Sequence, residues 1–425
     1  MLSRVIKNVQ DRLASPKGLL AAARKHTMAS SSSATCSPQV GGHRRSSFDE
    51  TFEVDDNRNA ILGAGAFGTV RLARRRTDGS RFAVKTLPAS RFRSEEVTLP
   101  IRVAENLRRS NRDPRNVVSV KGIHWDERKI EYERKGDDNE HVHENVHVAM
   151  ELLEGCELFQ RVLDFGKMSE REAQDVALLM AEAVESCHMA GVAHLDVKPE
   201  NFCFRHSWER EEGELSSKSL GLCGEENDLV LIDFGSAVAT QPQRGILVDN
   251  CLGHMKGDEY TFKYVQELGH EAGSMTYAAP EIVAPSAIKE LPGKPCGGMP
   301  SDVWSLAICM YVVSTGCFPL VDGKCFSELS HGGSSAVTQL YSNMCETHNS
   351  LFHERDQVRD ALNFDDESKE QFLDLLQAMT SMKAAERPAI REVIESEWLA
   401  GARERRKELL CVPSDWIDSE SKMVL

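Results

Sequence analysis

A short polar segment in the middle of the chain, His194–Asn201, carries the residues best suited to chemistry. It follows a helical stretch and the β-like pair Val192-Ala193. One loop therefore holds Asp196, Lys198 and Asn201 at relative positions 0, +2 and +5. A carboxylate there can accept the proton of an alcohol, a lysine can steady a phosphoryl group in transfer, and an asparagine can bind magnesium. The segment predicts phosphoryl transfer, with these residues as base, phosphoryl stabiliser and metal ligand.

A second reactive carboxylate follows a strand-like run. Leu229–Ile232 is continuously apolar, as expected for a buried strand, and leads into Asp233-Phe234-Gly235. An aspartate at this strand end can chelate a magnesium ion that bridges nucleotide phosphates. The triplet alone is common, but here it lies downstream of the first segment. We predict Asp233 as the second metal ligand.

A glycine-rich hairpin precedes both segments. The stretch up to Val70 matches G-x-G-x-x-G-x-V, whose first six positions a dinucleotide-binding loop shares. Here the glycines join two strands, whereas a dinucleotide loop opens a helix; a strand–turn–strand lets backbone N–H groups cover phosphates. The strand Phe82–Lys85 follows, so Lys85 can neutralise α- and β-phosphate oxygens. The predicted phosphate-covering residues are Gly63, Ala64, Gly65, Ala66, Phe67 and Gly68.

Lys85 needs a carboxylate partner from the next helix. The spacing to the following strand at Asn116 favours Glu105, with Glu95 and Glu96 as alternatives. Arg109 departs from the pattern, because an apolar residue usually stands four positions after the partner.

The elements that must position these groups divide the chain. From Phe52 short β-like runs dominate, with a turn at Asp78-Gly79. Beyond residue 170 an apolar stripe recurs at helical spacing: Val176, Leu179, Met180, Ala183, Val184 and Cys187. A strand-rich part followed by a helix-rich part predicts two lobes with a ligand cleft between them.

Taken together, these motifs resemble the eukaryotic protein kinase family. The match continues through Ala279-Pro280-Glu281, Ser301–Ser305 and Arg387-Pro388, and covers roughly Phe52 to Leu399. The resemblance implies an α+β, two-lobed fold, with a β-rich N-lobe over about 52–153 and a helical C-lobe over about 154–399. It also implies that Glu281 pairs with Arg387 and that Asp302 braces the segment His194–Asn201, which is the catalytic loop of this family.

The resemblance further implies ATP and Mg²⁺ as cofactors and an adenine pocket. The strand and hinge would be Val148–Leu153, with Met150 as gatekeeper and with Glu151 and Leu153 in the hinge. Apolar walls are expected from Leu62, Val70, Ala83 and Cys203.

The substrate class is indicated by residues around the base. Lys198 is typical of serine/threonine kinases, and Ser274 before the Ala-Pro-Glu motif fits the same class. Glu157 and Glu200 match positions that face substrate arginines in basic-directed kinases, which predicts protein substrates with basic residues before the acceptor. The alternative is that both are solvated surface glutamates.

The loop carries Leu195 where the family usually has arginine, as in the myosin-light-chain and death-associated kinases of the calmodulin-dependent group. Without that arginine a phosphate on the activation loop loses its usual anchor. We therefore predict activity that does not depend on phosphorylation there, for example at Thr240 or Thr261.

The ends of the chain differ from the middle. Residues 1–50 form a basic, serine-rich segment, which predicts either a disordered tail or a mitochondrial or plastid transit peptide. Its Arg44-Arg45-Ser46-Ser47 run is either a polar linker or a phosphosite for a basic-directed kinase. Residues 400–425 form a short tail whose arginines give a weak signal for a calmodulin-type partner. Long polar inserts are expected near 126–144, 205–227, 241–271 and 322–360.

Composition excludes several classes. The net charge of −15 argues against nucleic-acid binding, and no apolar run reaches the roughly 18 residues of a transmembrane helix. Twelve scattered cysteines without a C-x-x-C pair indicate reduced thiols and an intracellular compartment, which we expect to be cytoplasmic or nuclear. We also expect a monomer. Two rival functions are disfavoured: a pseudokinase scaffold, because all four key polar residues are present, and a small-molecule kinase, because of the Ala-Pro-Glu motif.

Overall fold

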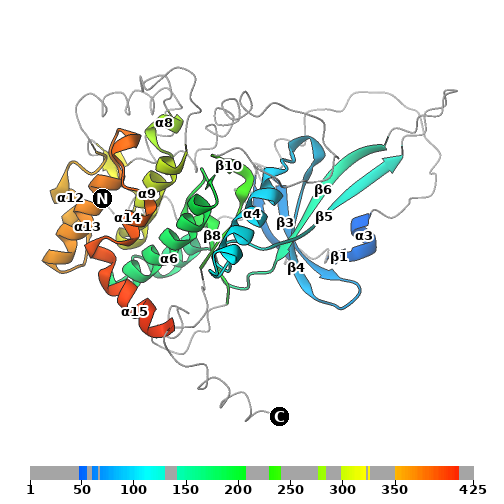
Figure 1. Cartoon of the computed structure of the whole chain (residues 1–425), viewed down its shortest axis with the longest axis horizontal. Helices are drawn as coiled ribbons and strands as arrows, with labels where there is room; N and C mark the ends of the chain where they lie inside the picture. The colour runs from blue at the N-terminus through cyan, green and yellow to red at the C-terminus, as the bar shows by residue number, and fades with distance from the viewer. Residues whose placement is uncertain are drawn as a thin grey trace, which may run out of the picture. The chain divides into compact units, whose positions relative to one another are not determined.

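An antiparallel sheet forms the N-terminal part of the fold (Figure 1). The computed structural model describes residues 47–54, 60–65, 68–129, 141–206, 229–240, 276–283, 298–321, 324–325 and 350–410. Within them the sheet has the order β1-β3-β4-β6-β5, and β2 pairs with β3. The strands are β1 (Phe52–Val54), β2 (Ile61–Gly65), β3 (Gly68–Arg75), β4 (Arg81–Pro88), β5 (Val120–Lys129) and β6 (His141–Glu151).

The predicted turn between β3 and β4 is confirmed. Gly79 has φ +72°, a left-handed conformation that favours glycine, and the Asp78 side chain accepts a hydrogen bond from the Ser80 N–H at 3.0 Å. The hairpin fixes the register of β3 on β4, so that Val70 lies opposite Lys85.

A short helix, α3 (Ser47–Thr51), packs against this sheet before β1 begins. The Phe48 ring stacks on the His147 ring of β6, with 4.0 Å between centroids and 7° between planes. Phe48 and Phe52 are both buried in the same small cluster. The described packing therefore already includes residues that precede the predicted start at Phe52.

Helices dominate the rest of the described chain, as predicted for the second lobe. The helix α4 (Glu95–Arg109) belongs to the sheet-rich lobe. The later helices are α5 (Leu158–Phe165), α6 (Glu170–Met189), α8 (Pro280–Val283), α9 (Met299–Thr315), α12 (Arg355–Ala361), α13 (Asp366–Met379), α14 (Ile390–Ile394) and α15 (Ala400–Leu410). Short strands pair among them: β7 (Val192–Ala193) with β10 (Val238–Ala239), β8 (Phe202–Phe204) with β9 (Leu229–Leu231), and β11 (Leu320–Val321) with β12 (Lys324–Cys325).

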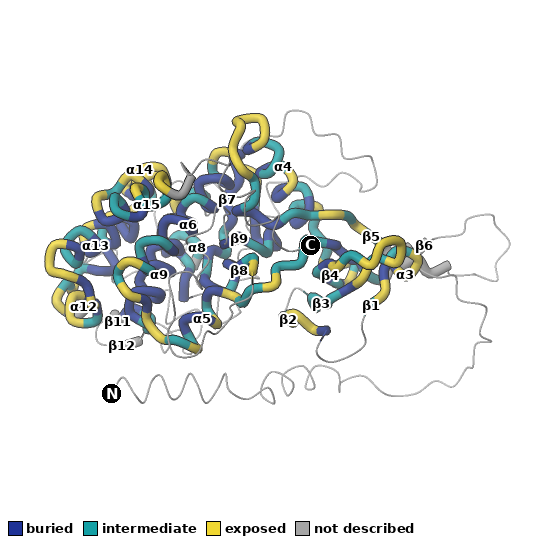
Figure 2. Tube along the Cα trace, turned by 90° about the horizontal axis from the view of Figure 1, so that it is seen from below, coloured by how far each residue is buried: buried dark blue, intermediate teal, exposed yellow. Residues whose placement is uncertain are grey.

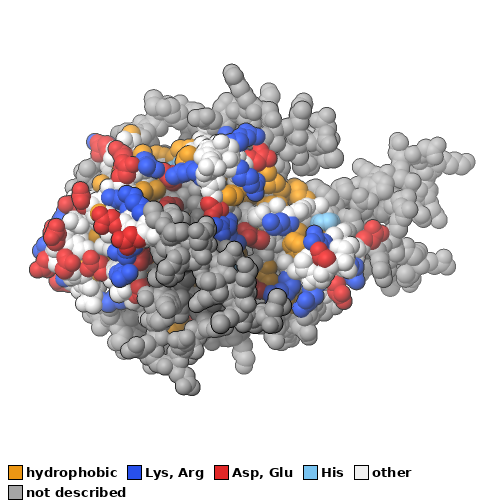
Figure 3. Space-filling view, turned by 60° about the horizontal axis from the view of Figure 1, so that its bottom comes forward, with side chains coloured by type: hydrophobic (Ala, Val, Ile, Leu, Met, Phe, Trp, Pro, Cys, Tyr) orange, Lys and Arg blue, Asp and Glu red, His pale blue; other side chains and the backbone are white. Residues whose placement is uncertain are grey.

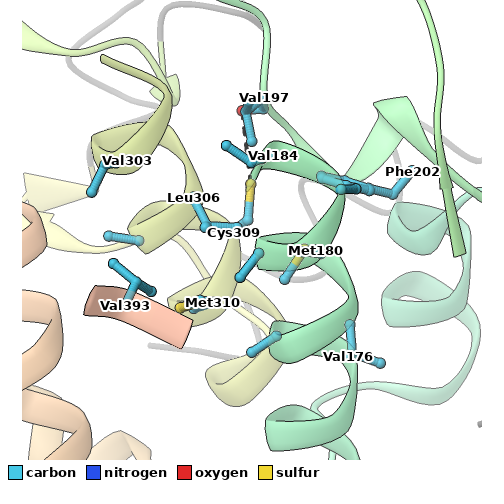
Figure 4. Packing of buried hydrophobic residues seen from close by; sticks show 14 of the residues in the cluster. Val176, Met180, Val184, Val197, Phe202, Val303, Leu306, Cys309, Met310 and Val393 are labelled. Atoms are coloured by element: carbon cyan, nitrogen blue, oxygen red, sulfur yellow. Dashed lines mark hydrogen bonds between the residues drawn. The ribbon is translucent and has the colours of Figure 1, made fainter. Parts of the chain in front are cut away.

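The helical lobe is organised around α6 and α9. A capping box at Ser169 and Glu172 starts α6, and every residue of its predicted apolar stripe is buried. The helix α9 is buried on all sides from Ser301 to Thr315. Figure 4 shows Met180 and Val184 of α6 beside Leu306 and Cys309 of α9, below Val197 of the catalytic loop. The loop therefore rests on buried residues of the large core, and Figure 2 shows many buried stretches in this lobe.

The surface carries both charge signs. In Figure 3 acidic and basic side chains are interspersed over the described part of the visible face. None of the helices in the described ranges is both long enough and apolar enough to cross a bilayer.

Glu281 of α8 and Arg387 form the buried ion pair that the resemblance implies. Arg387 donates from Nη1 to Glu281 Oε1 at 2.6 Å and from Nη2 to Oε2 at 2.8 Å, while Ser301 Oγ donates to Oε1 at 2.7 Å. The guanidinium also lies 5.0 Å from the centroid of the Trp304 ring. Burial alone would raise the pKa of Glu281, but the hydrogen bonds and charge of Arg387 outweigh it and hold the pKa below its ordinary value of 4.5.

We expect Glu281→Gln to lower the free energy of unfolding by about 3 kcal/mol at pH 7, because it leaves the buried Arg387 charge uncompensated. A depressed folded-state pKa gives stability that is present above the unfolded pKa of 4.5 and is lost as pH falls through the folded value. The difference from wild type should therefore shrink at about pH 3.5. Urea unfolding at the two pH values measures it.

Glu395→Gln is the matched control, because its ion pair with Arg391 has side chains 58% and 59% exposed. Its cost should stay below about 1 kcal/mol at either pH. An equal loss for Glu281→Gln at both pH values would contradict the assignment of this pair as the pH-sensitive brace.

Candidate active site

Lys85 of β4 sits in a buried cluster of charges between the two lobes. Its Nζ lies 3.0 Å from Asp233 Oδ1 and 3.1 Å from Glu96 Oε2. The side chains of Lys85 and Glu96 are only 9% and 5% exposed. Burial lowers the pKa of Lys85, but the charges of Asp233 and Glu96 outweigh it, so the pKa is raised and the lysine stays charged. One cation thus joins the sheet, helix α4 and the strand end that carries Asp233.

The expectation that Glu105 pairs with Lys85 is wrong. Glu105 forms an exposed pair with Arg109 instead, 3.4 Å apart, and the Arg109 side chain is 78% exposed. Helix α4 begins at Glu95, so its buried face runs through Glu96, Pro100, Val103 and Leu107, at the spacing of one helical stripe. An apolar residue is expected four positions after the partner of Lys85. With Glu96 as the partner this residue is the buried Pro100, so the exposed Arg109 no longer conflicts with the family pattern.

Asp233 has a strained backbone that directs its carboxylate. Its φ of +57° is in the left-handed region, which is uncommon for a residue with a side chain. Its Oδ1 accepts a hydrogen bond from the Gly235 N–H at 3.2 Å in addition to the one from Lys85. A Cβ on Gly235 would lie 3.1 Å from that same oxygen, so glycine keeps the space open. Burial would raise the pKa of Asp233, but Lys85 outweighs it and lowers the pKa.

The three predicted residues of the catalytic loop are in contact. Asn201 Nδ2 donates to the Asp196 backbone oxygen at 2.7 Å and to Asp196 Oδ2 at 2.9 Å. Lys198 Nζ lies 2.8 Å from the same carboxylate oxygen. Burial lowers the pKa of Lys198, but the Asp196 charge outweighs it and raises the pKa, so the lysine remains an ammonium. Because the Asn201 amide nitrogen is directed at Asp196, its amide oxygen faces away from that residue.

Backbone contacts connect this loop to the Asp233 strand. The Ile232 N–H donates to the Asn201 carbonyl at 2.8 Å, and a ring nitrogen of His194 lies 3.1 Å from the Ile232 carbonyl. The His194 and Phe234 rings meet edge to face at 4.9 Å. The two predicted metal ligands, Asn201 and Asp233, are thereby held on neighbouring backbones.

Asp302 holds the loop from below, and this expectation is confirmed. Its carboxylate accepts the His194 N–H at 2.8 Å and the Leu195 N–H at 2.7 Å, and it also contacts a ring nitrogen of His188 at 2.9 Å. The side chain is fully buried. Leu195 has φ +60°, so two consecutive N–H groups converge on one carboxylate at the position where the chain turns.

The glycine hairpin is formed as predicted where the structure describes it. Gly65 lies opposite Gly68 and Gly63 opposite Val70. Gly68 has φ +127°, and a Cβ there would come within 2.3 Å of the Thr86 carbonyl, so only glycine allows this close approach. Ala66, Phe67 and Ser274 lie outside the described residues, as does Thr261.

The predicted adenine-pocket residues lie on strands of the large sheet, on β8 and on the segment that follows β6. Val70 is opposite Lys85, Ala83 is opposite Met150, and Cys203 lies on β8 at the base, where it is bridged to Glu157. Leu62 is 46% exposed, and Leu153 is partly buried against the large core. The Glu151 side chain is engaged elsewhere, with Arg205 at 2.7 Å and the Ser119 N–H at 2.9 Å, so only its backbone can serve as a hinge contact.

Asp233 and Asn201 fit a magnesium site only together with a phosphate-bearing ligand. Within the described ranges, no group of three or more His, Cys, Asp or Glu could hold a metal ion by itself. Asp233 and Asn201 supply one carboxylate and one amide oxygen, which are the hard ligands that Mg²⁺ takes in small number beside substrate phosphates. The donor set thus matches a metal that arrives with its nucleotide.

Glu157 and Glu200 lie near Lys198. Lys198 acts electrostatically on both carboxylates. Burial nevertheless raises the pKa of Glu157, and it raises that of Glu200 to about 7. Glu157 is nonetheless an exposed residue and Glu200 a partly buried one, so the carboxylate of Glu157 is open to a cationic ligand.

Known proteins resemble this chain over the region that holds the site. The family described as "Protein kinase domain" matches residues 57–399. Calcium-dependent protein kinase 25 of Arabidopsis thaliana is 26% identical over 294 residues, covering 68% of this chain and 44% of the relative. Calcium-dependent protein kinase 12 of the same plant is 30% identical over 276 residues, 64% of this chain and 42% of the relative.

A potato relative, calcium-dependent protein kinase 4 of Solanum tuberosum, is 26% identical over 344 residues. It aligns with 80% of this chain and 45% of its own length, so the chain spans less than half of each of these relatives. The family match covers most of the chain and includes every residue of the charged cluster, and the chain therefore belongs to the protein kinase domain family.

Proposed function

We propose that this chain is an ATP-dependent protein kinase that transfers the γ-phosphate to serine or threonine hydroxyls of proteins. The observation that carries the proposal is the continuous contact path from Lys85 through Asp233 to Asn201, Asp196 and Lys198. The path contains a lysine for phosphates, two oxygen ligands, a base and a second ammonium. A pseudokinase would not need all of them in contact.

Each residue has a role that its surroundings support. Lys85, kept charged by its two carboxylates, binds the α- and β-phosphate oxygens, and Glu96 orients its ammonium. Asp196 accepts the proton of the acceptor hydroxyl, while Lys198 balances the charge on the phosphoryl group in transfer. Asn201 and Asp233 would hold Mg²⁺, which when bound neutralises charge on the phosphates.

Serine and threonine are favoured by the place of Lys198. Its ammonium bonds the base directly at 2.8 Å, which is the arrangement expected of serine/threonine kinases. The relatives that match the chain are named as calcium-dependent protein kinases. No EF-hand pattern occurs in this sequence, so their calcium dependence is not part of the proposal.

A calmodulin-type partner for the C-terminal helix has less support. Arg405 Nη2 of α15 lies 2.6 Å from Asp175 of α6, and Arg406 Nε lies 3.4 Å from Glu182 of the same helix. Arg403 donates to backbone carbonyls that precede α15. These arginines hold α15 on the C-lobe, so a partner would have to compete with those contacts.

Asp196→Asn should lower phosphorylation of a basic serine peptide by about 10²- to 10⁴-fold, because the amide cannot accept the hydroxyl proton. Affinity for magnesium ATP should stay within about threefold, since the residue does not touch the nucleotide in the proposed scheme. Transfer of radiolabelled phosphate and nucleotide titration measure the two effects. A wild-type chain that binds the nucleotide but transfers nothing would instead identify a pseudokinase.

Glu96→Gln should reduce kcat/KM by about 10- to 100-fold, the range for losing a hydrogen bond to a charged group. The same change at Glu105 is the matched control on the same helix, and we expect less than about a twofold effect because its pair with Arg109 is exposed. Steady-state kinetics with varied ATP tests both. Equal losses in the two variants would show that the Lys85–Glu96 contact does not serve the reaction.

Glu157→Gln should raise KM up to about fivefold for a peptide with arginine before the acceptor serine, as expected for the loss of a charge pair with an exposed carboxylate. A peptide with alanine in place of that arginine should be unaffected. Glu154→Gln is the control, because Glu154 is also exposed but already pairs with Arg81. A similar rise for both peptides would mean that Glu157 does not read substrate charge.

A further inference from the structure

Helix α4 begins weakly at the turn that carries Glu96. The N-cap residue, Ser94, has helical dihedral angles and makes no side-chain capping hydrogen bond. Its hydroxyl lies against the Glu95 carboxylate instead, at 3.3 Å. The first turn of the helix therefore lacks the usual side-chain cap, which in comparable helices contributes about 1 kcal/mol.

A buried proline weakens the same turn from its other side. Pro100 stands four residues after Glu96 inside the helix and has no N–H. The Glu96 carbonyl thus loses the hydrogen bond that the fourth following residue would normally donate. The turn that positions Glu96 is joined to the rest of α4 by fewer bonds than an ordinary helical turn.

Arg93, just before the helix, supplies a contact from outside it. Its Nη1 donates to the Gly235 carbonyl at 2.8 Å, and its Nη2 lies 3.4 Å from the Ala237 carbonyl. The side chain is only 22% exposed. Both acceptors follow Asp233 closely, on the segment that begins with the short helix Phe234–Ser236 and continues into β10.

The contact links the two carboxylates that bind Lys85. Glu96 lies three residues after Arg93, and Asp233 lies two residues before Gly235. Fixing Arg93 on the Gly235 carbonyl therefore limits the separation of both Lys85 partners at once. The backbone of Arg93 is also joined to the helix, since the Glu96 N–H donates to the Arg93 carbonyl at 3.1 Å.

We propose that Arg93 is a positioning residue that locks the first turn of α4 onto the chain after Asp233, and so assembles the Lys85–Glu96–Asp233 cluster. The inference rests on the proposed kinase function and deepens it. The catalytic loop has Leu195 where an arginine would anchor an activating phosphate. Arg93 bonds backbone carbonyls and not a phosphate, so we expect the lock to form in the unphosphorylated chain.

The test compares Arg93→Ala in the phosphatase-treated full chain with Arg108→Ala. Arg108 is exposed at the far end of the same helix and lies outside the cluster. We expect kcat/KM to fall by about 10- to 100-fold in the first variant, as for a lost charged hydrogen bond, and to stay within about twofold in the second. Arg93→Lys, which can still reach one carbonyl, should recover part of the loss.

Pro100→Ala supplies a readout that a merely structural role would not move. This substitution restores the N–H that bonds the Glu96 carbonyl, so the first turn becomes supported from within. The loss from Arg93→Ala should then shrink to about threefold or less in the Pro100→Ala background. If the fold-changes in kcat/KM from Arg93→Ala and Pro100→Ala simply multiply in the double variant, the proposal is wrong. An unchanged kcat/KM in Arg93→Ala would also overturn it.

Hydrogen exchange separates this proposal from the function on which it rests. Arg93→Ala should speed exchange of the Thr98 and Leu99 amides by about tenfold or more, because local opening of the first turn becomes easier, while the amides of the buried helix α9 stay as in wild type. If the wild-type chain transfers no phosphate and these amides still respond, the kinase proposal fails and the lock remains. Unchanged exchange at these amides would refute the lock whatever the activity.

Discussion

The buried carboxylate of Asp302 is the constraint on which the rest of the site depends. A fully buried charge is unfavourable unless hydrogen bonds compensate it, and here two consecutive backbone N–H groups and a histidine ring do so. Asp302 also lies in the first turn of α9, where the helix dipole favours a negative charge. Because α9 is buried on all sides, the core fixes the positions of the Asp302 carboxylate oxygens. These oxygens in turn fix the backbone of the catalytic loop at His194 and Leu195.

A few polar contacts connect this loop to the sheet-rich N-terminal lobe. His194 and Asn201 bond the backbone at Ile232, and this fixes the strand end where Asp233 begins. Asp233 in turn holds Lys85, which belongs to the sheet. Of the two carboxylates that bind Lys85, Glu96 lies in the first turn of α4, which has no side-chain cap and is followed by Pro100, whereas Leu99, Val103 and Leu107 further along belong to the large core. Adjustable geometry is therefore concentrated at one end of the contact path.

The sequence predicted the parts whose chemistry requires a fixed spacing. The catalytic loop, the metal aspartate, the glycine hairpin and the two-lobed fold follow from residue types at set intervals. Glu96 was open to error because the choice among the three glutamates depends on where α4 begins, and Pro100 inside the helix obscures its start. The apolar stripe of Pro100, Val103 and Leu107 was the available signal. Arg93 could not be found this way, since its acceptors are carbonyls and leave no residue signature.

Leucine at position 195 is compatible with this structure because the backbone N–H of the residue, and not its side chain, holds the loop on Asp302. A left-handed conformation costs a residue with a Cβ about 1 kcal/mol, and both Leu195 and Asp233 adopt it. At Leu195 the strain is balanced by the N–H that bonds Asp302, an interaction that no side chain at 195 affects. The loop keeps its shape with any residue that tolerates the turn. What an arginine at position 195 would add is an anion contact, whereas the first turn of α4 is tied to the Gly235 carbonyl by Arg93, a contact that involves no anion.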